Sequence, residues 1–209
     1  MESHLPGDPV DRELRRRHLA QRLTAHHART GTIFHLTGLS RHQLATMRQR
    51  WRIPNEMRRR GPPPTSFAVL RSTLRTRDEA AALAVQWKVL AGVDAERSPH
   101  PKATSNVEMG ERLCEVIESH LACFPHSELE LEHLILLTQG LAEADAIALS
   151  ACGSCEGVIL ADLLERRRHL CSHCQRVSDA VALPSQSDKN GEPSRPAAGN
   201  GEAVQQELF

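Results

Sequence analysis

The chain has 209 residues, of which 26 are basic and 26 acidic, so its formal net charge is zero. A chain of this length can bury a hydrophobic core and form one or two domains. Its first residues lack the apolar segment of an export signal, and no run of about 18 apolar residues offers a membrane span. These features predict a cytoplasmic protein that has no membrane partner.

The neutral total hides an uneven distribution of charge. Residues 1–77 hold 16 arginines and 5 acidic residues, a net charge of +11, whereas residues 78–150 hold 4 basic and 13 acidic residues, a net charge of −9. This asymmetry predicts that the N-terminal part faces nucleic acid and that the acidic part, which phosphate would repel, meets a protein. The alternative interpretation is two solvated charged faces.

Apolar residues recur at helical spacing through the first two thirds of the chain, which predicts a mainly α fold. Proline runs interrupt this pattern at residues 52–66, and a polar loop is expected over 94–106. The predicted helical ranges are 8–28, 29–51 with a turn at Gly38, 76–93, 107–123 and 128–149.

Gly38 separates two short helical patterns. Glycine accepts the positive φ of a tight turn, and Ser40 and Gln43 have the spacing of a capping box at the start of the second helix. This predicts a helix-turn-helix-like element whose second helix contacts DNA, although any helical hairpin with a glycine turn has the same pattern. The predicted DNA contacts lie on this element and in the arginine run after it: Arg41, His42, Gln43, Arg48, Arg58, Arg59 and Arg60.

Four of the six cysteines form two Cys-x-x-Cys pairs, Cys152 with Cys155 and Cys171 with Cys174, and 15 residues separate the pairs. This is the spacing of a zinc ribbon, in which each pair directs two thiolates to one metal ion. Four thiolates leave no open coordination position, so we expect one structural Zn²⁺ per chain, with a binding free energy of about 10–16 kcal/mol that is coupled to folding. A redox pair is the alternative, but it needs a thioredoxin-like βαβ context that this sequence lacks.

These patterns divide the chain into three parts. Residues 1–150 are predicted to form a helical region that binds DNA and a partner, residues 151–178 a small zinc-ribbon-like element with four cysteine ligands, and residues 179–209, rich in Ser, Pro and Gly, a disordered tail. There is no Gly-rich phosphate loop, nucleophile elbow or catalytic metal motif. We therefore expect a protein that is not an enzyme and has no small-molecule substrate.

Taken in order, several motifs resemble the flagellar transcriptional activator subunit FlhC. They are LSRHQLATMRQRW, RGPPP, a Trp-bearing helix that ends in AGV, and LSACGSCEG followed by LCSHCQ. The resemblance spans about residues 10–177. It implies a mostly helical activator that binds zinc through Cys152, Cys155, Cys171 and Cys174.

The resemblance also implies partners. It implies a hetero-oligomer with a helical FlhD-like protein that binds double-stranded promoter DNA, recruits RNA polymerase and activates flagellar or related promoters. The stretch VILADLLERRR between the cysteine pairs departs from the family, since it is compatible with a strand followed by a helix, and the long tail departs from it too. The rival function is a zinc-ribbon protein-interaction adaptor that does not contact DNA.

Overall fold

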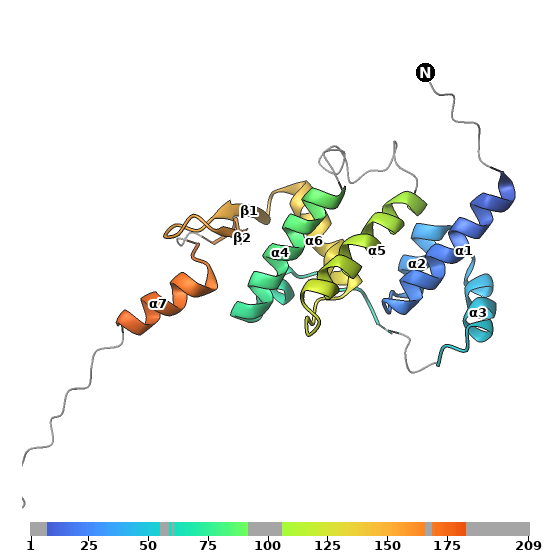
Figure 1. Ribbon diagram of the computed structural model, residues 1–209, viewed down its shortest axis with the longest axis horizontal. Coiled ribbons are helices and arrows are strands. Elements are labelled where there is room, and N and C mark those ends of the chain that lie inside the picture. The colour runs from blue at the N-terminus through green and yellow to red at the C-terminus, as the bar shows by residue number, and fades with distance from the viewer. Residues whose placement is uncertain (1–7, 55–58, 60, 92–105, 166–168, 183–209) are drawn as a thin grey trace, which may run out of the picture.

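The computed structural model describes residues 8–54, 59, 61–91, 106–165 and 169–182, and these are mainly helical with one small sheet. The elements are α1 (Pro9–Ala25), α2 (Thr30–Thr37), α3 (Arg41–Arg50), the 3-10 helix η2 (Phe67–Arg71), α4 (Leu74–Ala91), α5 (Asn106–Cys123), α6 (Leu131–Glu143), β1 (Ile147–Ala151), β2 (Val158–Asp162) and α7 (Ser172–Ala182). Figure 1 shows an elongated arrangement, with α1, α2 and α3 at one end, α4, α5 and α6 in the middle, and the strands with α7 at the other end.

Local signals set the ends of the N-terminal helices. The Asp8 carboxylate accepts a hydrogen bond from the Val10 amide at 3.0 Å, and proline follows it as the first residue of α1. Gly38 ends α2 with a φ of 69°, a conformation that glycine adopts without steric cost. Ser40 and Gln43 then form the reciprocal capping box at the start of α3. The predicted turn and both predicted helix starts are confirmed.

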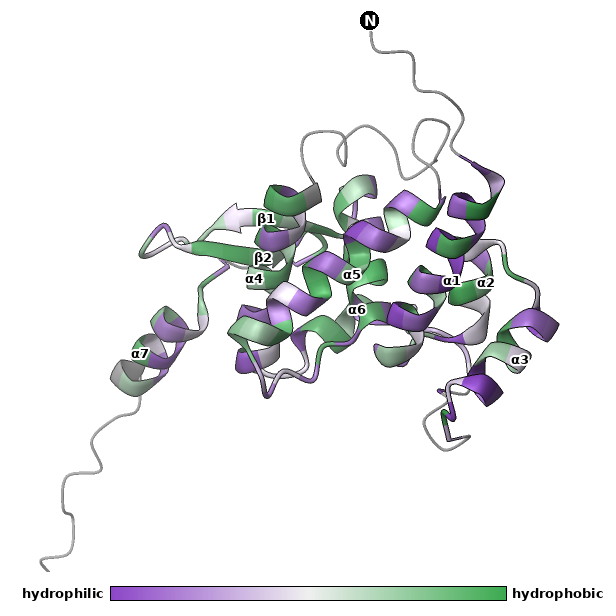
Figure 2. Ribbon diagram, turned by 45° about the vertical axis from the view of Figure 1, so that its right-hand side comes forward, coloured by the Kyte–Doolittle hydropathy of each residue, from purple (hydrophilic) through white to green (hydrophobic). Residues whose placement is uncertain are grey.

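The hydrophobic core lies where α5 packs against α1, α2, α4 and α6. Leu83, Ile117 and Leu137 are at most 1% exposed, and each buried side chain of this size contributes about 1.5–3 kcal/mol. Trp87 is also buried, as predicted for a core residue. In Figure 2 the ribbon of β2 and stretches of α4, α5 and α6 carry the colour of hydrophobic residues. No helix in the described ranges is long and apolar enough to cross a membrane.

The two strands form an antiparallel hairpin that is joined to this core. Their register runs from Ile147 opposite Asp162 to Ala151 opposite Val158. β1 packs on α6 and β2 packs on α4. Ile147 and Leu160 are at most 2% exposed and belong to the same hydrophobic cluster as the helices. The hairpin is therefore an extension of the helical body.

One predicted helix end and two predicted region boundaries differ from the structure. The helix expected over 128–149 ends at Glu143, because Ala144 adopts a φ of 51° and the chain after it pairs with β2. The predicted domain boundary at residue 150 thus falls inside β1. At the other end, α7 continues to Ala182, so residues 179–182 are helical and not part of a tail. The rest of the predicted tail, residues 183–209, lies outside the described residues, as does nearly all of the predicted loop over 94–106.

Candidate metal centre and nucleic-acid surface

The first cysteine pair lies on the turn between β1 and β2. The turn is closed by hydrogen bonds from the Cys152 amide to the Gly157 carbonyl, at 2.8 Å, and from the Glu156 amide to the Cys152 carbonyl, at 3.1 Å. Glu156 takes a positive φ of 61°, which lets the chain reverse within this short turn. Gly157 packs closely beside it, since a Cβ at this position would lie 3.4 Å from the Cys155 sulfur.

The second pair lies at the start of α7. Cys171 precedes the helix and Cys174 is in its first turn, where the Gln175 amide donates to the Cys171 carbonyl at 2.9 Å. Two bonds tie this segment to the first pair. The Gly153 amide donates to the His169 carbonyl at 3.0 Å, and the Cys171 amide donates to the Cys152 sulfur at 3.3 Å.

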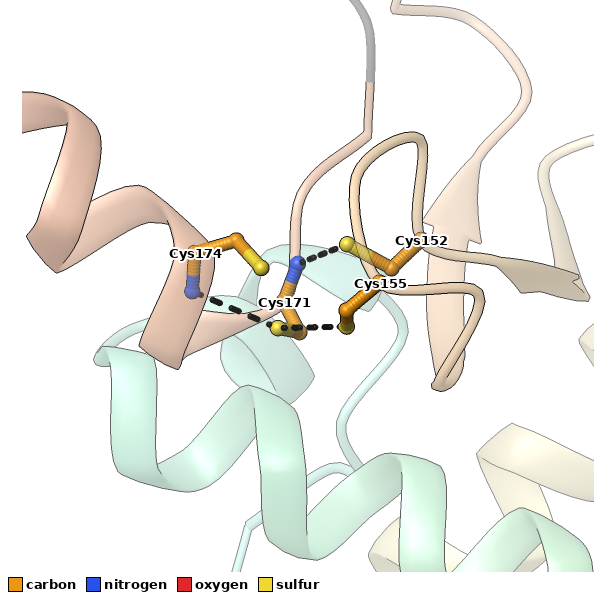
Figure 3. A group of neighbouring side chains, drawn as sticks. All are labelled: Cys152, Cys155, Cys171 and Cys174. Carbon is orange, nitrogen blue, oxygen red and sulfur yellow. Dashed lines mark hydrogen bonds between the residues drawn. The ribbon is translucent and has the colours of Figure 1, made fainter.

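The two pairs bring their four sulfur atoms together, as Figure 3 shows. All four Sγ atoms lie within 4.8 Å of one another, and those of Cys155 and Cys171 are 3.6 Å apart. A disulfide requires about 2.05 Å, and all six cysteines of the chain are free. The structure thus brings together the four predicted ligands, Cys152, Cys155, Cys171 and Cys174. In the described part of the chain, this four-cysteine cluster contains no histidine.

The electrostatics of the cluster favour a bound cation. The amides of Cys155, Cys171 and Ser154 donate to the Cys152 sulfur and lower the pKa of its thiol to about 6. The Ser154 hydroxyl stabilises the Cys174 thiolate, but hydrogen bonds with the neighbouring Cys171 and Cys155 sulfurs outweigh it and raise the pKa of Cys174 to about 12. Four thiolates this close together would repel one another, and a cation between them would offset that repulsion. Their soft sulfur donors suit a thiophilic metal ion.

Polar contacts hold the cysteine element against α4 and the segment before it. The Ser172 hydroxyl donates to the Asp78 carboxylate, and the Arg77 guanidinium donates to the Gln175 side chain at 3.1 Å. Arg71 forms an ion pair with Asp162 of β2 at 2.6 Å. The sequence analysis missed these supporting residues because each pair joins positions far apart in the chain.

The other two cysteines lie away from this cluster. Cys114 is fully buried in the core, and burial raises the pKa of its thiol to about 12. Cys123 is exposed at the end of α5.

The predicted DNA contacts have different positions in the structure. Arg41 and His42 are exposed at the start of α3. Gln43 is exposed as well, but its side-chain oxygen accepts the Ser40 amide at 2.8 Å in the capping box. Arg48 is only 5% exposed and donates to the Thr30 hydroxyl at 2.8 Å, so its predicted contact with DNA requires the side chain to turn outward. Arg59 pairs with Glu130, and Arg58 and Arg60 lie outside the described residues.

Much of the N-terminal positive charge is paired with the acidic part of the same chain. Arg15 forms an ion pair with Glu111 of α5. Arg22 pairs with Glu118 at 2.8 Å, and the His26 ring nitrogen lies 3.0 Å from the same carboxylate. Five exposed arginines, however, pair with no acidic residue of the described chain: Arg12, Arg16, Arg41, Arg50 and Arg52. They lie on α1, on α3 and just after α3.

The comparisons with known proteins do not assign the chain to a family. No protein-family model matches it, and no curated protein does.

Proposed function

We propose that this protein is a DNA-binding transcriptional activator subunit whose C-terminal element is held in shape by one structural zinc ion. The observation that carries the proposal is the arrangement α2, Gly38 turn and α3, in which the second helix begins with exposed Arg41 and His42. The first turn of the second helix is the part of a helix-turn-helix that contacts base edges. Arginines without an internal acidic partner stand beside it and can meet phosphate.

The four cysteines support zinc as the metal. With a Zn–S distance of about 2.3 Å, a tetrahedral site places its sulfurs about 3.8 Å apart, and the Cys155 and Cys171 sulfurs are 3.6 Å apart. The first pair lies on a hairpin turn, as in a zinc ribbon, while the second pair begins a helix. The role we infer is structural, because four protein ligands complete the coordination of the ion.

The proposed partners follow from the FlhC-like motifs and from the charge. In this proposal a helical FlhD-like protein completes a hetero-oligomer, the complex binds double-stranded promoter DNA, and RNA polymerase is recruited there. Exposed apolar residues around the cysteine element offer a protein contact: Val158, Leu163, Leu164 and Val177. The same residues favour the second candidate function, a zinc-dependent adaptor that binds proteins and does not contact DNA.

The test is fluorescence anisotropy of the zinc-loaded chain, alone and with its FlhD-like partner, on promoter and scrambled duplexes. Arg41→Ala should weaken promoter binding and reduce the preference for promoter over scrambled DNA. Arg17→Ala is the matched control, since Arg17 is an exposed arginine of α1 that pairs with Glu13 at 2.8 Å. Equal losses of promoter affinity in both variants would contradict the proposal that α3 contacts the bases. No binding to either duplex, with zinc bound, would favour the adaptor.

A further inference from the structure

A cavity of about 780 Å³ opens between α2, α5, α6 and the extended segment after Gly61. This volume lies within the range of about 300–1,000 Å³ that is typical of small-molecule sites. Its lining is mainly apolar and draws on four different helices: Leu36, Trp87, Met109, Leu113, Ile135 and Leu136. Several of these side chains are themselves nearly buried, so the cavity reaches the hydrophobic core.

The Glu132 carboxylate lies in this apolar wall, and only one of its two oxygens accepts hydrogen bonds from the described residues. Glu132 is only 5% exposed, and its Oε1 atom accepts the Arg29 amide at 2.9 Å and the Thr32 hydroxyl at 2.8 Å. The Arg29 guanidinium approaches the same oxygen at 3.9 Å. The second oxygen, Oε2, has no hydrogen-bond partner among the described residues. Because Oε2 is not among the fully buried polar atoms without a partner in the described residues, it stays open to the cavity, where a bound donor can reach it.

The charges in the lining select the sign of a ligand. Glu132 and Glu143 are the acidic groups of the wall, and Arg29 and His35 are the basic groups among the lining residues of the described chain, so with histidine counted as neutral the wall has a net charge of −1. A cationic group therefore balances the wall, whereas an anion would meet two carboxylates. The apolar remainder of the cavity requires that most of the ligand be hydrocarbon.

We propose that this cavity is a binding site for a small, largely apolar amine, whose ammonium group pairs with Glu132. The site does not depend on DNA binding. It does adjoin the proposed DNA-binding element, because Glu132 also holds the first turn of α2, the helix that precedes the Gly38 turn and α3. A ligand on Glu132 would thus contact the anchor of that element.

The test uses Trp87 fluorescence. The chain has two tryptophans, so Trp51→Phe leaves Trp87, which lines the cavity, as the sole emitter. The probes are 4-phenylbutylamine, 4-phenylbutanol and 4-phenylbutyrate, which share an apolar body and differ in charge. We expect a saturable change with the amine, at least tenfold weaker binding of the alcohol and no binding of the carboxylate. This comparison does not depend on any Glu132 variant folding.

Variants then test the assigned contact. Glu132→Gln should abolish the preference for amine over alcohol while alcohol binding remains, and Glu115→Gln, on an exposed face of α5 outside the lining, should change neither. Ala142→Phe, at an exposed point of the lining, should weaken both probes. The absence of any saturable response would overturn the site. Equal binding of amine and carboxylate, or an unchanged preference in Glu132→Gln, would overturn the assigned ligand class.

Discussion

Removal of the proposed zinc ion should release the second cysteine pair and α7 but leave the helical body folded. The hairpin keeps its own apolar anchors, since Ile147 and Leu160 are buried in the main core. α7 has 11 residues, and isolated helices shorter than about 12–15 residues are marginal in water, so the helical signal should fall by roughly a tenth. If the body loses about 1 kcal/mol through the contacts of Ser172 and Gln175, its melting temperature should fall by about 2–4 °C.

The assay compares the zinc-loaded chain with a chelator-treated sample and with Cys152→Ser, by circular dichroism and metal analysis. Cys123→Ser is the matched control, because this exposed cysteine lies outside the cluster. If chelation abolishes most of the helical signal in one cooperative transition, the reasoning that the hairpin and body stand without the metal is refuted. If it changes neither helicity nor proteolysis near α7, the site has no structural role.

Three further changes test the packing and the charges. Burial lowers the pKa of His120, so unfolding takes up a proton and the free energy of unfolding should decline as pH falls below about 6.5. Denaturant melts of His120→Gln should show a weaker decline with pH. An equal decline would exclude His120 as its source. Glu118→Gln removes the charged partner of Arg22 and should lower the free energy of unfolding by about 0.2–1 kcal/mol at low salt. An unchanged free energy of unfolding would mean that the pair does not contribute to stability. Gly140→Val should cost about 1–3 kcal/mol, because a Cβ there would lie 2.6 Å from the Phe67 ring, and a stabilised variant would argue against that close packing.

The features predicted correctly from sequence are those encoded by neighbouring residues. The Asp8 cap, the Gly38 turn and the Ser40 capping box each depend on side chains within a few positions of one another. The four-cysteine cluster is also local in this sense. Each Cys-x-x-Cys pair brings its two sulfurs together by its own turn, so the fold needed only to bring one turn to the other.

The features that sequence reasoning missed depend on contacts between distant residues. Ile147–Ala151 has apolar residues compatible with a helix, and only the pairing with Val158–Asp162 makes it a strand. Arg48 is one of the predicted DNA contacts on α3, yet its side chain donates a hydrogen bond to Thr30. Neither segment alone contains a sequence pattern that predicts such a pairing.

The charge asymmetry also cannot be interpreted from the sequence alone, because some of the arginines pair with distant acidic residues. The number of arginines left for phosphate sets the salt dependence expected for DNA binding. If all 16 arginines of residues 1–77 met phosphate, the logarithm of the binding constant would fall with the logarithm of salt concentration with a slope of about −14. Arg15 and Arg22 are paired across 96 residues with α5, and among the described arginines of that region five are exposed without an acidic partner.

If those five arginines contact phosphate, the slope is about −4.5. Phosphate contacts by Arg58 and Arg60 as well would make it about −6. A salt titration of the isolated chain on promoter DNA should therefore give a slope between these two values. A much steeper slope would mean that DNA displaces the acidic residues of α5 from α1. A slope near zero would mean that the unpaired arginines do not face phosphate, and the adaptor function would then account better for this surface.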